Sequence, residues 1–174
     1  CGRITLDGDT EAEVLAQDAQ TGLALLRPTR ALAPLSVARF ATGTPRLQSE
    51  VSVAGYSYEG VLSAATLTYG KVADVEGLNG ETPLNRLALT ARAGDAGGPV
   101  FDATGAVVGM LRSPQDGSAQ LPPDTSFAIV TESIAQAATD AGLTLEASEG
   151  LGVMPPRDLT RQAQNMTVLV SCWE

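Results

Sequence analysis

The sequence contains no histidine, one lysine and few aromatic side chains. Without histidine, the chain lacks the side chain whose ordinary pKa suits general-base catalysis near neutral pH. Aromatic residues make up only 4%, so valine, leucine, isoleucine and alanine must build most of the core. No apolar run approaches the 18 residues of a transmembrane helix, and we expect no membrane insertion.

Positive charge is also scarce. Twenty acidic residues oppose eleven basic ones, which gives a formal net charge of −9. Such a surface repels phosphate backbones, so nucleic acid is not an expected partner. The acidic stretch LDGDTEAE, residues 6–13, lacks the spaced ligands and the closing glutamate of a calcium loop. We expect no metal and no cofactor.

Only two cysteines are present, Cys1 and Cys172, at opposite ends of the chain. They are either unrelated buried thiols or the two halves of one bridge. A bridge would imply an oxidising compartment and, because it closes so long a loop, would strongly restrict the unfolded chain. We expect the bridge.

The 174 residues suffice for one compact domain or two small lobes, and 18 glycines and 10 prolines separate short apolar segments. This pattern favours β-strands joined by tight turns, and Asp7-Gly8 suits a type I′ hairpin. Strands are expected at 3–6, 11–17, 22–28, 50–58, 85–91, 98–102, 106–112, 126–130 and 166–172, with two pieces at 64–75 kinked at Gly70. One helix is predicted at 132–141, and residues 148–158 read as a loop. The fold class is therefore all-β, a barrel or a sandwich with about ten strands.

A glycine-rich turn stands out in AGDAGGPVFDATGAVVGM, residues 93–110, between an expected strand and an expected hairpin. The segment TSFAIV and the predicted helix follow it. These segments resemble the trypsin-like serine protease superfamily, particularly its bacterial HtrA/Deg-like branch. That branch carries Gly-Asp-Ser-Gly-Gly-Pro or Gly-Asn-Ser-Gly-Gly-Pro, then a similar hairpin and a Ser-Phe-Ala-Ile strand. The similarity covers most of the chain up to about Ser148.

The resemblance implies a double β-barrel with one late helix and a first barrel that is incomplete at the N-terminus. We expect residues 1–60 to form the remnant of the first barrel and 61–148 to form the second barrel with the helix. Residues 149–174 would be a tail whose last strand returns to the first barrel. Open edges favour a dimer or strand exchange. The chain is expected to belong to a longer multidomain protein in the periplasm or outside a bacterial cell.

The resemblance also implies which residues stand at the catalytic positions. Ala96 occupies the place of the nucleophilic serine, and a methyl group cannot attack a carbonyl. Gly22 occupies the place of the triad aspartate, and the family histidine would precede Cys1. The amides of Gly94 and Ala96 would form the oxyanion hole. Ala96 on its own is compatible with an engineered serine-to-alanine substitution. The additional absence of the triad aspartate at Gly22 favours a naturally inactive relative.

A substrate cleft is implied beside this turn. Its floor would come from Ala91, Arg92 and Ala93, and an extended peptide would pair with the strand residues Thr125, Ser126, Phe127 and Ala128. An inward Arg92 would favour acidic ligand side chains, although an arginine exposed on a loop is the simpler interpretation. The Ser126 hydroxyl is expected to be satisfied within the cleft wall.

Three functions remain open at this stage. The first is a peptidase domain without a working triad that binds or scaffolds an extended peptide or protein segment. The second is an HtrA-like serine endopeptidase, truncated and with its serine replaced by alanine. The third is a structural spacer in a larger envelope protein.

Overall fold

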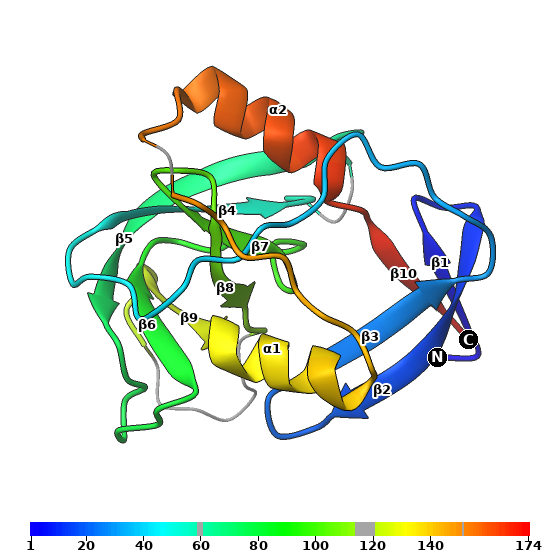
Figure 1. Ribbon diagram of the computed structural model, residues 1–174, viewed down its shortest axis with the longest axis horizontal. Helices are drawn as coiled ribbons and strands as arrows, with labels where there is room; N and C mark the ends of the chain where they lie inside the picture. Colours follow the sequence, from blue (N-terminus) through cyan, green and yellow to red (C-terminus); the bar gives the residue numbers. More distant parts are fainter. Residues whose placement is uncertain (59–60, 114–120, 151) are drawn as a thin grey trace.

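The computed structural model describes residues 1–58, 61–113, 121–150 and 152–174 (Figure 1). The described residues form ten strands and two helices, so the protein is mostly β, as expected. In chain order the elements are β1 (Arg3–Leu6), β2 (Thr10–Asp18), β3 (Leu23–Pro28), β4 (Glu50–Gly55), β5 (Thr66–Asp74), β6 (Leu84–Ala88), β7 (Pro99–Asp102), β8 (Val107–Leu111), β9 (Thr125–Val130), α1 (Thr131–Asp140), α2 (Pro156–Met166) and β10 (Val170–Trp173). Neither helix has both the length and the apolar character needed to cross a bilayer.

Six strands close into a barrel in the order β4-β5-β6-β9-β8-β7. Small aliphatic side chains fill its interior, among them Val53, Val72, Leu87 and Val100, as the shortage of aromatics required. A closed barrel leaves no unpaired edge strand. Because β4 belongs to this barrel, the barrel begins at Glu50, and the sequence-based boundary at residue 60 lies too late.

The remaining strands form an open sheet in the order β10-β1-β2-β3. Asp7 and Gly8 connect β1 to β2 with φ angles of 49° and 88°, the signs that a type I′ turn requires. β10 pairs antiparallel with β1, and a disulfide joins Cys1 to Cys172 with 5.3 Å between their Cα atoms. The two chain ends therefore lie side by side (Figure 1).

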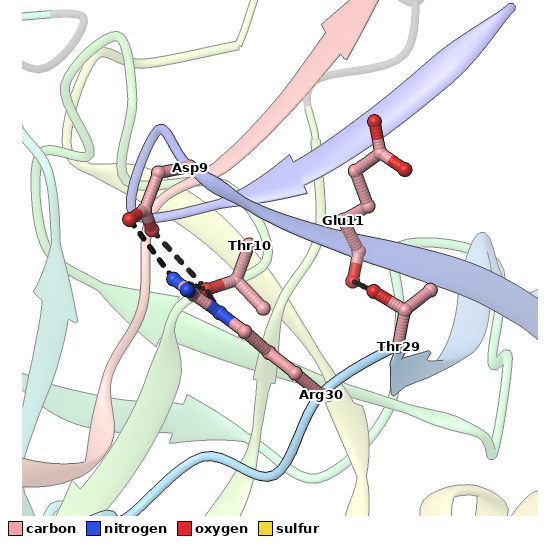
Figure 2. Close-up of polar contacts among 5 residues, drawn as sticks. All are labelled: Asp9, Thr10, Glu11, Thr29 and Arg30. Carbon is pink, nitrogen blue, oxygen red and sulfur yellow. Dashed lines mark hydrogen bonds and ion pairs between the residues drawn. The ribbon is translucent and has the colours of Figure 1, made fainter.

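The chain that leaves β3 is fastened to the β1–β2 hairpin by Arg30 (Figure 2). The guanidinium of Arg30 donates hydrogen bonds of 3.0 and 2.8 Å to the Thr10 hydroxyl and lies 2.9 Å from the Asp9 carboxylate. The Thr29 hydroxyl donates to the carbonyl of Glu11 over 3.1 Å. The hydrogen bond from Arg30 lowers the pKa of Asp9. These contacts fix the start of the long connection to β4.

The structure corrects two expectations about elements. β5 runs unbroken through Gly70, whose missing side chain makes room for the carbonyl of Ala88, 2.4 Å from where a Cβ would lie. The segment expected to be a loop ends instead in α2, with Pro156 in its first turn, where proline costs no hydrogen bond. Leu159 and Ala163 on α2 are buried against the barrel, so packing of these two side chains stabilises the helix although its other residues are mostly polar.

Asp7 and Tyr56 hold the segment between α2 and β10. The backbone N–H of Asp7 donates to the carbonyl of Leu169 over 2.8 Å. The carboxylate of Asp7 accepts a hydrogen bond of 2.9 Å from the N–H of Leu169. The Tyr56 hydroxyl donates to the carbonyl of Thr167 over 3.2 Å and lies 3.4 Å from the Asp7 carboxylate. Tyr56 follows β4, so it ties the barrel to the open sheet.

Candidate functional site

The glycine-rich turn, residues 92–98, connects the region after β6 to β7 and packs on the end of β4. Gly94 and Gly97 have φ angles of 88° and 81°, in the left-handed region that side chains disfavour. A Cβ on Gly98 would lie 1.8 Å from the carbonyl oxygen of Ala54. The turn therefore needs glycine for two reasons, backbone angle and close approach.

A buried carboxylate holds this turn in place. Asp95 is 1% exposed, and its Oδ1 accepts a hydrogen bond of 2.6 Å from the Ser57 hydroxyl. Its Oδ2 accepts a hydrogen bond of 2.8 Å from the backbone N–H of Arg92. With the side chain of Asp95 directed inward, the next residue, Ala96, is exposed. The sequence interpretation gave Asp95 and Ser57 no role.

The backbone N–H groups of the turn divide into two sets. Those of Asp95, Gly97 and Gly98 donate to Arg92, Leu111 and Asp95 carbonyls over 2.8–3.0 Å. Within the described part of the chain, the N–H groups of Ala93, Gly94 and Ala96 donate to no acceptor, and Gly94 and Ala96 are the pair that the family resemblance singles out. These two donors remain available to an oxygen atom of a ligand.

Beside the turn lies a cavity of about 750 Å³. Its wall contains Gly94, Ala96 and six of the seven expected cleft residues, namely Ala91, Arg92, Ala93, Thr125, Ser126 and Phe127. The seventh, Ala128, is not part of it. Ala128 is 1% exposed, and its side chain packs in the barrel core instead.

Segments distant in the sequence complete the cavity wall and were not expected from the motif. The connection from β5 to β6, the start of β6, the end of β8 and the approach to β9 contribute Leu78, Asn79, Glu81, Leu84, Leu111, Arg112, Ser113, Leu121, Pro122 and Pro123. No local pattern marks these residues, since they meet only after the barrel closes.

The expected pairing of a peptide with β9 stays a prediction, and the neighbours of β9 limit the edge at which a peptide can pair. β9 lies between β6 and β8, and Thr125 to Ile129 all face partners on β6. On its other side, Arg112 donates from its N–H to the carbonyl of Phe127 over 2.8 Å. The next residue, Ser113, is exposed, and its backbone forms no hydrogen bond with another described residue.

Ser126 behaves as expected, since its buried hydroxyl donates to the carbonyl of Leu89 over 3.0 Å. Gly22 stands at the start of β3 with a φ of 76°, and its N–H donates to the Asp18 carbonyl over 2.8 Å. Gly22 is not part of the cavity wall. The wall reaches this turn through Arg112, whose guanidinium donates to the carbonyl of Gln20 over 3.3 Å.

In the ranges that the structure describes, the cavity wall carries two arginines and one acid. The Arg92 guanidinium stacks on the Tyr58 ring, 5.7 Å from its centroid, so this exposed arginine is held at the cavity rather than extended into solvent. The carboxylate of Glu81 accepts hydrogen bonds from the N–H and the amide group of Asn79 over 2.8 and 3.0 Å. These bonds lower the pKa of Glu81, with a smaller contribution from the charge of Arg112. Among the described residues, no cluster of three or more acidic, cysteine or histidine side chains could hold a metal ion.

Comparison with known families gives a direct match. The model of the trypsin-like peptidase domain matches residues 4–110. The uncharacterized protein y4bJ of Sinorhizobium fredii is 29% identical over 168 residues, 92% of this chain. The chain spans only 26% of the length of that relative.

Solved bacterial serine proteases share the fold. An inactive serine-to-alanine mutant of Rv3671c from M. tuberculosis is 25% identical, with a TM-score of 0.58 over 78% of this chain and 67% of that one. The active form of Rv3671c protease is 23% identical, with a TM-score of 0.60 over 84% and 66%. The serine endoprotease from Yersinia pestis is 20% identical, with a TM-score of 0.60 over 76% and 44%.

Proposed function

This chain belongs to the family of trypsin-like peptidase domains, and we propose that it binds extended peptide segments without hydrolysing them. One observation carries the proposal: an alanine methyl, not a hydroxyl, accompanies the two unoccupied amides at the cavity wall. The chain also contains no histidine to act as general base. The amides of Gly94 and Ala96 and the cavity remain available for binding a peptide. The serine hydroxyl and the histidine that would cleave its peptide bond are missing from this chain.

The proposed mode of binding uses the chain at the end of β8, which lines the cavity with Leu111, Arg112 and Ser113. A peptide laid along Ser113 would hydrogen-bond to the chain end of β8 and place one side chain in the cavity. Main-chain hydrogen bonds then supply affinity and the cavity supplies specificity. The disulfide favours an oxidising compartment and supports our proposal that the domain works in the bacterial envelope or outside the cell.

A pooled library of acetylated, C-terminally amidated pentapeptides of randomised sequence tests binding. We expect the pool to shift the backbone amide signals of Ala91–Ala96 and Ser113 in a ¹⁵N-labelled sample, and the peptides to stay intact. Ala93→Trp, which fills the cavity, should abolish the shifts. Ala33→Trp, at an exposed position outside the cavity, is the matched control. An unshifted spectrum, or shifts that persist in Ala93→Trp, would contradict the proposal.

The alternative, an HtrA-like serine endopeptidase whose serine has been replaced, draws support from the intact turn geometry. A serine codon at position 96 in the parent gene and a histidine codon upstream would favour it. Cleavage of labelled casein by the parent protein would then decide for the endopeptidase.

A further inference from the structure

The charge of the cavity wall is opposite to that of the protein. The whole chain carries a net charge of −9, yet among the described residues the cavity wall holds two arginines, Arg92 and Arg112, against one carboxylate, that of Glu81. Seven of the ten arginines form ion pairs, and these two form none with another described residue. A wall of this kind attracts an anion that the remaining surface repels.

The opposing charge of Glu81 is already engaged. Its two carboxylate oxygens accept hydrogen bonds from Asn79, one from the backbone N–H and one from the side chain. Arg92 is positioned by the Tyr58 ring instead of by an acid. The ring neutralises no charge, so the guanidinium keeps donors for a ligand.

The two open amides of the turn favour the same kind of ligand. A hydrogen bond from an N–H to a charged oxygen is about twice as strong as one to a neutral carbonyl. Since Ala96 has no hydroxyl, this position has no nucleophile to attack a carbonyl. The ligand therefore need not present a peptide carbonyl here, and a carboxylate can occupy the same place. The neighbouring wall is apolar, with Leu84 and Phe127 available to an aliphatic side chain.

We propose that the ligand of this cavity is the C-terminal end of a peptide, held by its free carboxylate. The inference rests on the proposed peptide-binding function and narrows it. One carboxylate oxygen accepts from the N–H groups of Gly94 and Ala96, the guanidinium of Arg92 or Arg112 compensates the charge, and the last side chain enters the apolar part of the cavity.

Two acetylated tetrapeptides, each three alanines followed by leucine, test the inference by calorimetric titration of the full chain. One ends in a free carboxylate and the other in a carboxamide. We expect the free acid to bind at least tenfold more tightly. Ala96→Asp should remove this preference by repelling the carboxylate, while Ala96→Asn, of the same size but neutral, should keep it.

Equal binding of acid and amide, or an acid preference that survives Ala96→Asp, would overturn the carboxylate assignment. The amidated pool separates this failure from that of the proposed function. If the pool shifts the cavity signals while the acid shows no advantage, peptide binding stands and only the carboxylate assignment is lost. If neither the pool nor either tetrapeptide binds, both are lost.

Discussion

Ser57 donates a hydrogen bond of 2.6 Å from its hydroxyl to Oδ1 of the buried carboxylate of Asp95. Ser57 follows β4, whereas Asp95 lies in the turn that forms the cavity wall. The contact therefore fixes the turn to the barrel from within, and the backbone N–H of Arg92 completes the coordination of the same carboxylate.

Replacing Ser57 with alanine leaves one oxygen of a buried carboxylate without this donor. We expect Ser57→Ala to lower the free energy of unfolding by about 1–3 kcal/mol, the cost of an unsatisfied buried polar group. Urea unfolding measures it. Ser63→Ala, at an exposed serine, should change stability by less than about 0.5 kcal/mol. Equal stability of the two variants would show that Asp95 does not depend on this bond.

The Tyr56 hydroxyl makes stability sensitive to alkaline pH. Burial, followed by the nearby charge of Asp7, raises the pKa of Tyr56 above its ordinary value of 10.0. Because the folded state holds this proton more tightly, the stabilisation is complete below about pH 10 and is lost as the pH rises through the higher folded pKa. Tyr56→Phe should flatten the fall in stability above pH 10. Tyr69→Phe, at an exposed tyrosine, should leave the fall unchanged in urea unfolding series at pH 8–11.

The disulfide joins residues 171 positions apart. A bridge over so long a loop restricts the unfolded chain, and we expect the double substitution Cys1→Ser, Cys172→Ser to cost about 2–4 kcal/mol. In the double variant, hydrogen exchange of the amides of β1 and β10 should become faster than in the original chain, while exchange in the closed barrel changes less. A reductant should weaken the original chain by the same amount and leave the double variant unaffected. Unchanged exchange in β1 would mean that strand pairing alone holds β10.

Restoring side chains at the two vacant positions should not restore catalysis. The double substitution Gly22→Asp, Ala96→Ser supplies an acid and a hydroxyl, yet the chain contains no imidazole to activate the hydroxyl. We expect no cleavage of fluorescein-labelled casein above the rate of the unmodified chain. An increase of a hundredfold or more would contradict the proposed function and show that another group serves as general base.

Local signals predicted much of this fold. The Asp7-Gly8 turn and the alternating segments located nearly every strand, because each depends on neighbours in the sequence. α2 was missed because Pro155-Pro156 indicated a loop, although Leu159 and Ala163, four residues apart, mark a helix face. The position of β9 between two strands was missed as well, since strand order depends on contacts far apart in the chain.

The candidate site was predictable only where it is contiguous. The motif led to Gly94, Ala96 and the residues just before them, all at the cavity. Arg112 and Glu81 have no signal of their own, because their role arises when the end of β8 meets the connection from β5 to β6. Asp95 was read as part of a motif, and only its burial reveals it as the anchor of the turn.

The close approach of Gly98 to the Ala54 carbonyl shows that this turn needs glycine for folding, independently of any catalytic role. A chain that never cleaved a peptide bond would still need a residue without a side chain at 98 to close its barrel. The glycines of such a motif therefore persist for architectural reasons after an enzyme loses its reaction, and within this turn only the residue at 96 bears on whether a relative is active.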